Sequence, residues 1–390
     1  MKKTNLLIIE HSLPFYHIPA WQLLGSHPEI DLTVAYGQGY FTGKVSGVPE
    51  GIIPGNASFK HEKCNIVRNI AGKKILWHST SISLLKKGNY DVVIHQFELK
   101  MMSMFPALYL AKRKKSKFSL WGIGNPLIPN PMIDKVRKLL AKKTDAMVFY
   151  SETNKERYLN WGIEPSKLFV AKNSVDVDTI IELANKWTHE KIVEFKNQHH
   201  IPDKMIMTMG RLIERKKIEW LILAIHKVLP DYPNIRLVII GNGPEYEKLN
   251  GLVNSMKISD NVIFTGKLEG FDSISPWFLS SDLIISPAQV GHLATEAHAY
   301  GIPLILSDNK SSQGPEAEIL IPDETGLLYH DGQVDHLADQ IRRYFSSPEL
   351  QVKIKSQNQQ RAKDFAGTKI MVNGFIDTIN YLTSNNLAYF

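Results

Sequence analysis

Cysteine is scarce in this sequence: Cys64 is the only one among 390 residues. A single thiol cannot form a disulfide within the chain, and it excludes a zinc site built from several cysteines. The sequence also lacks a run of about 18 apolar residues, which a membrane-spanning helix needs. The opening MKKTNLLIIEHS has too short an apolar stretch for a signal peptide, so we expect a first strand there and a cytoplasmic protein.

Acidic residues are too few to balance the basic ones in the first half of the chain. Residues 1–178 hold 25 Lys and Arg against 14 Asp and Glu, whereas the remaining residues hold 21 against 25. Most of the excess comes from two runs, Lys112–Lys117 and Lys135–Lys143. Such runs can contact an anionic membrane or an anionic substrate, or they can be solvated helix faces. They lack interleaved aromatic residues, so we expect no nucleic-acid partner.

Short apolar runs alternate with helical patterns along most of the chain. The runs are rich in Val, Ile and Leu on both faces, which is typical of parallel strands covered by helices on two sides. The expected strands are 5–9, 31–36, 92–95, 117–121, 146–150 and 168–171 in the first half, and 205–209, 236–240, 262–265, 283–286 and 303–306 in the second. This repetition predicts an α/β protein with two Rossmann-like, doubly wound parallel sheets.

The pattern pauses and restarts near residues 173–202, which indicates a second domain. We expect a first domain over 1–175, a second over 176–364, and a C-terminal helix at about 365–390 that packs back on the first. Ligands of open α/β sheets bind at the carboxyl ends of the strands, so two such domains predict a cleft that binds a ligand. The glycine-rich loop at 36–60 is either a lid or a mobile connection.

Three motifs that follow strands of the second half carry chemical content. The first is GRLIERKK at Gly210–Lys217, where Arg211 and Lys216 flank a helix start and suit a diphosphate; a basic surface turn is the alternative. The second is GNGPE at Gly241–Glu245, whose glycines permit a close turn and whose Pro244 suits the first position of a helix. It lacks the third glycine of the dinucleotide fingerprint, since Tyr246 stands there, and this argues against an NAD enzyme.

The third motif is SPAQVGHLATEA at Ser286–Ala297, where a strand leads through a loop with Gly291 into a helix that begins near His292. Free backbone N–H groups at a helix start favour anions. Glu296 lies one turn into the helix, where its carboxylate can accept two hydrogen bonds from ribose hydroxyls. The alternative is a glutamate that balances the helix dipole.

Together these motifs resemble the retaining nucleotide-sugar glycosyltransferases of the GT-B fold, specifically family 4 (glycosyl transferases group 1). The resemblance covers residues 140–345 and also rests on VIFTGK at 262–267, GIPLI at 301–305 and the segment from Glu318 to ETGLL. It implies a GT-B fold with an acceptor domain first and a nucleotide-sugar donor domain second. It further implies a retaining, metal-independent transfer of a sugar to a glycan or lipid-linked acceptor in polysaccharide biosynthesis.

The resemblance also implies roles for individual residues. Arg211 and Lys216 hold the donor diphosphate, Glu296 binds the ribose, and Lys267 borders the nucleobase. The backbone around Gly291–Leu293 faces the sugar and the phosphates. With two cations on the diphosphate, we expect no metal and no separate cofactor. The implied catalytic residues are Arg211, Lys216 and His292, and the implied donor-binding residues are Gly210, Arg211, Lys216, Gly243, Lys267, Gly291, His292, Leu293, Thr295 and Glu296.

Two departures from the family pattern bear on activity. The family has a first glutamate that faces the donor sugar, and Ala288 stands there; Ile123 stands where the family has an acceptor-side histidine. Either the chain is an active enzyme in which His292 or another group touches the sugar, or it is an inactive subunit that acts as a binding or scaffold partner. A nucleotide-sugar epimerase or hydrolase of the same fold is a further alternative.

The first half supplies the residues expected on the acceptor side, which are His11, Tyr16, His95 and Gly122. The basic first half also predicts peripheral contact with an anionic membrane, on its cytoplasmic face. Asp176-Val177-Asp178 has the DxD spacing that holds a divalent ion in metal-dependent transferases, but we interpret Asp178 as a helix N-cap.

Overall fold

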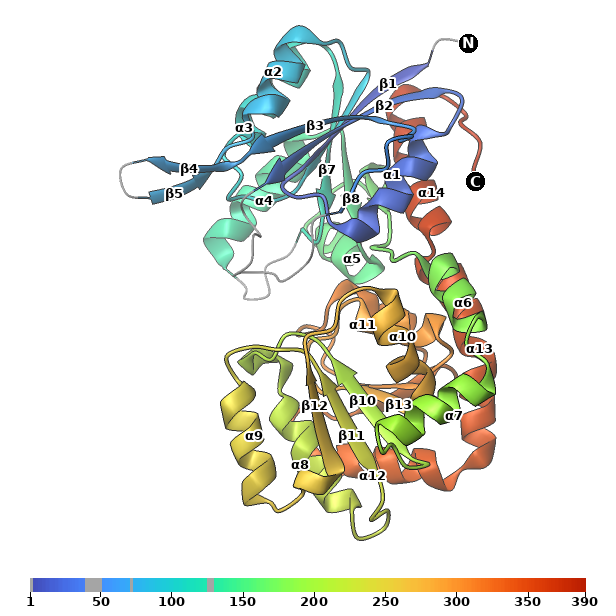
Figure 1. Cartoon of the computed structure of the whole chain (residues 1–390). Coiled ribbons are helices and arrows are strands. Elements are labelled where there is room, and N and C mark those ends of the chain that lie inside the picture. The colour runs from blue at the N-terminus through green and yellow to red at the C-terminus, as the bar shows by residue number, and fades with distance from the viewer. Residues whose placement is uncertain (1–2, 39–50, 71–72, 125–129) are drawn as a thin grey trace. The chain divides into compact units, whose positions relative to one another are not determined.

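The computed structural model describes residues 3–38, 51–70, 73–124 and 130–390 of the chain. These divide into two compact units, Met1–Ser174 with Thr368–Phe390, and Val175–Gly367 (Figure 1). The loop expected as a lid at 36–60 falls partly outside the described residues, because 39–50 are not among them. Within the described part of the chain, every helix is too short or too polar to cross a membrane.

The first unit is built on a parallel sheet of seven strands in the order β3-β2-β1-β6-β7-β8-β9, with a separate antiparallel pair β4-β5. Strands β1, β6 and β8 are buried on both faces, so their apolar residues do not alternate with polar ones. The strands are β1 (Thr4–Glu10), β2 (Ile30–Gln38), β3 (Lys60–Asn65), β4 (Val67–Ile70), β5 (Lys73–Leu76), β6 (Val92–Gln96), β7 (Lys117–Gly122), β8 (Ala146–Phe149) and β9 (Leu168–Val170).

Helices cover both faces of this sheet. They are α1 (Ile18–Gly25), α2 (Ser79–Lys87), α3 (Met104–Arg113), α4 (Pro131–Lys143), α5 (Glu152–Asn160) and the C-terminal α14 (Thr368–Thr383). The last helix returns to the first unit and lies beside α1, as the red and blue ribbons of Figure 1 show. Its Phe375 packs against Trp21 and Trp121, with ring centroids 5.3 and 5.1 Å apart, so the chain's two ends share one core.

The second unit is built on a parallel sheet of six strands in the order β12-β11-β10-β13-β14-β15. The strands are β10 (Met205–Met209), β11 (Arg236–Ile240), β12 (Val262–Gly266), β13 (Leu283–Ser286), β14 (Leu304–Ser307) and β15 (Gly326–Tyr329). Because β10 pairs with both β11 and β13, the order of the strands reverses between β10 and β13. Ligands of doubly wound sheets bind in the crevice at such a reversal.

Eight helices surround this sheet within the described residues. They are α6 (Val177–Asn185), α7 (His189–Gln198), α8 (Ile218–Val228), α9 (Tyr246–Ser255), α10 (Phe271–Ser280), α11 (Leu293–Ala299), α12 (Val334–Ser346) and α13 (Pro348–Ala366). The fully buried core on one face joins α8 and α12 to the sheet through apolar residues such as Leu221, Ile225 and Ile341. This packing holds rigid strands beneath the loops that carry the motifs.

Candidate functional site

The motif residues of the second unit gather on the loops at the carboxyl ends of β10, β11 and β13. The GRLIERKK segment follows β10, GNGPE follows β11, and the loop at residues 287–292 follows β13. Since β10 lies between β11 and β13 in the sheet, the three loops are neighbours at one edge. The strand order reverses between the strands that precede the first and third of them, and doubly wound sheets bind their ligands at such a reversal.

Lys216 links these two loops. It sits at the end of a short 3-10 turn, Glu214–Lys216, and its ammonium Nζ donates a hydrogen bond of 2.7 Å to the backbone carbonyl of Gln289 in the 287–292 loop. Burial lowers the pKa of Lys216 to about 8, and the neighbouring Arg215 charge acts in the same direction, whereas Glu316 opposes it. A desolvated ammonium with one fixed acceptor still has protons to offer to an anion.

The β10 and β11 loops touch backbone to backbone, and two glycines allow it. A Cβ on Gly241 would lie 1.9 Å from the Gly210 carbonyl oxygen, and a Cβ on Gly243 would lie 2.1 Å from the carbonyl oxygen of Leu212. The Leu212 amide donates to the Asn242 carbonyl at 3.0 Å. Only glycine fits at both positions without a steric clash. The loop after β11 therefore supports the turn that carries Arg211.

The 287–292 loop is held by contacts at three of its residues. The Gln289 carbonyl accepts from Lys216, and the Val290 amide donates to the Gln313 side-chain oxygen at 2.8 Å. The Val290 carbonyl accepts from the Gly314 amide at 3.2 Å, and His292 Nδ1 lies 3.8 Å from Glu316 Oε1. The short segment 313–316 therefore holds the loop along one side.

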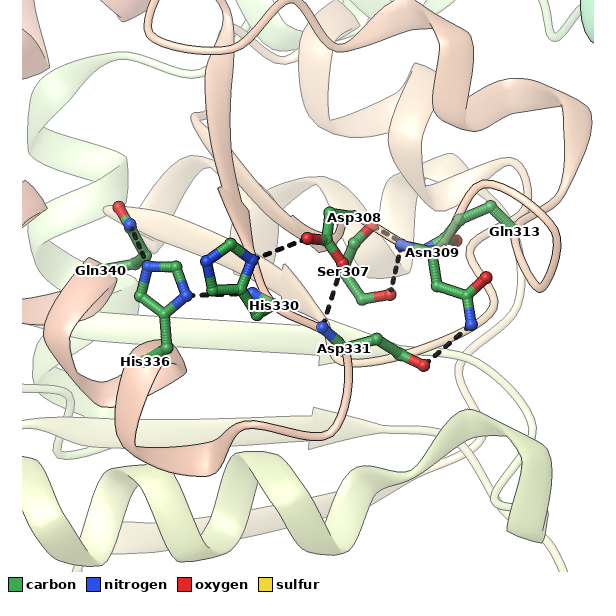
Figure 2. Close-up of polar contacts among 8 residues, drawn as sticks. All are labelled: Ser307, Asp308, Asn309, Gln313, His330, Asp331, His336 and Gln340. Atoms are coloured by element: carbon green, nitrogen blue, oxygen red, sulfur yellow. Dashed lines mark hydrogen bonds and ion pairs between the residues drawn. The ribbon is translucent and has the colours of Figure 1, made fainter.

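Gln313 also links the loop to the sheet through its side-chain nitrogen. Its side-chain nitrogen donates to the carbonyl of Ser307, the last residue of β14, at 3.2 Å. Figure 2 shows Gln313 at one end of a polar network at the carboxyl ends of β14 and β15. In this network Asp308 lies 2.8 Å from His330 Nδ1 and accepts from the Asp331 amide at 3.0 Å, and Asn309 donates to the Asp331 carboxylate at 2.8 Å.

Glu296 is buried in α11, together with its neighbours Leu293 and Thr295. Burial raises the pKa of the Glu296 carboxyl group to about 7, and no donor or cation among the described residues contributes to that shift. The Thr295 hydroxyl oxygen also has no hydrogen-bond partner in the described part of the chain. A carboxylate with no donor among the described residues can accept hydrogen bonds from a ligand.

The remaining predicted donor residues lie at the surface of the same edge or just beyond it. The Arg211 side chain is exposed, and Gly210 has a backbone φ of 149°, a conformation that favours glycine. Lys267 is exposed at the end of β12 and forms an ion pair with Glu269. Gly291 has open space where a Cβ would lie, and Ala288 is buried.

Two local details differ from the sequence expectations. The N-cap of α6 is Asp176, whose carboxylate accepts from the Thr179 amide at 3.1 Å, and Asp178 lies in the first turn of the helix. Pro244 was expected at the first position of a helix, but α9 begins two residues later at Tyr246. No group of three or more His, Cys, Asp and Glu side chains among the described residues is arranged to hold a metal ion.

The predicted acceptor-side residues His11 and His95 lie together in the first unit, where the strand order reverses between β1 and β6. His11 follows β1, and its backbone amide donates to the Gln96 side-chain oxygen at 2.9 Å. His95 Nδ1 donates to the Gln96 carbonyl at 2.7 Å. Burial lowers the pKa of both histidines to about 4, so both rings are neutral at pH 7. Tyr16 lies in the turn before α1, and Gly122 ends β7 with a φ of 154°.

Sequence reasoning missed several polar residues that support these positions. Glu10 is fully buried, lies 2.8 Å from His17 Nδ1 and accepts a hydrogen bond from Trp21 Nε1. Glu316 and Gln313 are the corresponding omissions in the second unit. An acidic residue at the end of an apolar strand, such as Glu10, is a sequence signal that could have indicated a functional position. The sequence around Gln313 and Glu316 contains no such signal.

Comparison with known proteins finds a family match within the second unit. Residues 190–361 match the family described as Glycosyl transferases group 1. An uncharacterized glycosyltransferase of Methanocaldococcus jannaschii is 31% identical over 162 residues, which are 40% of this chain and 40% of that protein. The N-acetyl-alpha-D-glucosaminyl L-malate synthase of Bacillus anthracis is 24% identical over 227 residues, which are 53% of this chain and 58% of the enzyme. This chain thus covers less than two thirds of the length of either relative.

The fold has counterparts among solved structures. The crystal structure of Anabaena HepE in complex with UDP superposes with a TM-score of 0.73 at 14% identity, over 97% of this chain and 100% of that chain. Its likeness, together with the two parallel sheets of seven and six strands, confirms the expected GT-B fold. Residues 190–361 therefore match the glycosyl transferases group 1 family, and the chain has the GT-B fold.

Proposed function

We propose that this protein is a retaining, metal-independent glycosyltransferase of family 4. It transfers a sugar from a nucleotide-sugar donor to a glycan or lipid-linked acceptor in polysaccharide biosynthesis. The observation that carries the proposal is the position of Lys216, whose ammonium group links the loops after β10 and β13 at the reversal of the second sheet. Arg211 projects from the same loop, so two cations stand where a doubly wound sheet binds phosphates.

These residues suit a reaction in which negative charge grows on a leaving diphosphate. Lys216 supplies a point charge in a desolvated position, where electrostatic stabilisation is stronger than in water. Arg211 supplies a planar group that can bind two phosphate oxygens at once. In a retaining transfer the departing diphosphate itself can take the proton of the acceptor hydroxyl, so the protein need not provide a general base.

The relatives support a nucleotide-sugar donor. HepE was crystallised with UDP and with UDP-glucose, and the Bacillus anthracis enzyme is named N-acetyl-alpha-D-glucosaminyl L-malate synthase. In this chain, Glu296 is the group proposed to bind the ribose, since its carboxylate has no described donor. Ala288 removes the carboxylate expected to face the sugar, so we propose that the sugar contributes little to donor affinity. His292, held near Glu316, is the side chain proposed to touch the sugar.

The proposal for the acceptor draws on the first unit. His11 and His95 are neutral at pH 7 and lie at the end of the sheet where its strand order reverses. Neutral imidazoles can accept or donate a hydrogen bond to an acceptor hydroxyl without placing a charge there. We further propose that the basic first unit meets an anionic membrane at its cytoplasmic face, that no nucleic acid is a partner, and that no separate cofactor is needed.

A two-step experiment tests the function. Thermal-shift measurements with a panel of UDP and GDP sugars should find a stabilising donor, since ligand at 100 times its Kd adds about 2.7 kcal/mol. That donor is then incubated with lipid-linked and free glycan acceptors, and the anomeric product is identified by NMR. Transfer with retained configuration supports the proposal. Binding without turnover indicates a scaffold subunit, and nucleotide release or a changed sugar without an acceptor indicates a hydrolase or an epimerase.

A further inference from the structure

Helix α4 of the first unit exposes a stripe of apolar side chains. Met132, Val136 and Leu139 are 79%, 41% and 55% exposed. Their spacing of four and then three residues puts them on one face of the helix, since residues so spaced lie one above another. Large apolar side chains scattered singly on a surface need no explanation, but three in a line along one helix do.

The orientation of α4 is set by its buried residues. Leu140 and Ala141 are buried in the core of the unit, and Asp134 forms ion pairs with Arg137 at 3.2 Å and with Arg157 of α5 at 3.1 Å. These contacts anchor the inward face with apolar packing and a double ion pair. The apolar stripe borders this buried part, since Leu140 follows Val136 by four residues, and it carries the apolar surface of the helix out to solvent.

Lysines flank the stripe. Lys135, Lys142 and Lys143 are exposed along α4, and Asp134 is the only acidic residue of the helix. Because Asp134 is engaged with two arginines on the inward face, no carboxylate of α4 offsets the charge of its outer face. Lys112, near the end of α3, donates to the Lys143 carbonyl, which brings the basic run after α3 next to the end of α4.

We propose that α4 is the element that lies on an anionic phospholipid bilayer. An interfacial helix combines an apolar face, which enters the boundary between headgroups and acyl chains, with lysines that reach the headgroups. A protein partner would need acidic groups at matching positions, whereas an anionic bilayer meets every lysine at once. The inference deepens the proposed membrane contact by naming its surface, and it depends on neither the donor site nor turnover.

Vesicle cosedimentation of the full chain tests this surface without any donor. Wild-type protein should bind phosphatidylglycerol-containing vesicles and should release as salt is raised, since surface charges are screened within a Debye length. The double variant Met132→Asp, Leu139→Asp should bind at least about tenfold more weakly, because two apolar contacts are lost and two like charges are added. Lys135→Glu, Lys142→Glu should weaken binding to phosphatidylglycerol vesicles by a similar factor and leave binding to pure phosphatidylcholine unchanged.

The matched control is Val352→Asp on α13 of the second unit. Val352 is 70% exposed and stands beside Lys353, yet it belongs to no apolar stripe, so vesicle binding should be unchanged. Wild-type binding by both α4 variants would overturn the proposal. Dimerisation in light scattering that the α4 variants abolish, without preference for anionic vesicles, would also overturn it by showing a second copy on this face. Thermal shifts with nucleotide, measured on the same variants, report the donor site separately.

Discussion

Replacing Glu296 with glutamine tests two things in one variant. These are the proposed ribose site and the free-energy cost of ionising the buried Glu296 carboxyl group. Glu296 is buried in α11, and burial alone raises the pKa of its carboxyl group from 4.5 to about 7. Near neutral pH the folded protein therefore holds a partly ionised carboxylate without a described partner. Glutamine keeps the shape and the hydrogen-bonding oxygen but cannot ionise.

The magnitude follows from the pKa difference between folded and unfolded states. Because the folded pKa is raised, the stabilising contribution of the protonated form is complete below pH 4.5 and is lost as the pH rises through 7. Each unit of pKa corresponds to about 1.4 kcal/mol, so ionisation costs roughly 3 kcal/mol at pH 8. We expect Glu296→Gln to melt about 5–10 °C above wild type at pH 8, with little difference at acidic pH.

The same variant should bind nucleotides less well. Ribose hydroxyls donate to a carboxylate in charge-assisted hydrogen bonds of about 1.5–3 kcal/mol, so the Kd should rise about ten- to a hundredfold. Wild-type affinity should fall as the pH drops below 7, because Glu296 must first lose its proton, and the variant should not show this dependence.

Scanning calorimetry and titration calorimetry with UDP and GDP measure both effects. Glu247→Gln is the control, since Glu247 is exposed on α9. A Glu296→Gln protein that binds UDP or GDP as tightly as wild type would refute the ribose assignment. A lower melting temperature than wild type at pH 8 would refute the electrostatic argument.

Four further outcomes are expected. Lys216→Met should lower kcat/KM about a hundredfold, as for loss of one preorganised donor, with an unchanged circular dichroism spectrum; normal turnover would remove Lys216 from the site. Transfer should persist in excess EDTA, and loss of activity that magnesium or manganese restores would make Asp176 and Asp178 candidate ligands. Gly243→Ala should lower the free energy of unfolding by about 1–3 kcal/mol in urea titrations, because the added Cβ meets the Leu212 carbonyl. Gln313→Ala should raise KM for the donor several-fold while the melting temperature changes little; a change in melting temperature alone would limit Gln313 to a structural role.

The buried strands could be predicted because their pattern is local. The expected strands 205–209, 236–240 and 283–286 coincide with β10, β11 and β13, since runs of Val, Ile, Leu and Met buried on both faces stand out in the sequence. The edge strand β3 was missed. Its sequence KHEKCN is mostly exposed and polar, and it becomes a strand only by pairing with β2.

The supporting residues of the site could not be predicted for a related reason. Motifs report residues that lie close together in sequence, such as Arg211 and Lys216. Gln313 contacts Val290, and Glu316 lies near His292. The residues of each pair are more than twenty positions apart in the sequence, and Gln313 and Glu316 lie in the segment that follows β14. The departure at Asp178 is smaller: in Asp-Val-Asp either acid can cap a helix, and only the backbone conformation selects Asp176.

In both units, residues that are far apart in the sequence meet where the strand order of the sheet reverses. In each sheet the strand order reverses once, between β1 and β6 in the first and between β10 and β13 in the second. At a reversal the loops on either side turn away in opposite directions and leave a gap at the sheet edge. Here a polar side chain reaches into each gap. Gln96 meets the backbone of His11 at 85 residues' separation, and Lys216 meets the backbone of Gln289 at 73. The sequence therefore shows each residue at a reversal without its partner, and only the order of the strands in the sheet shows which two residues meet.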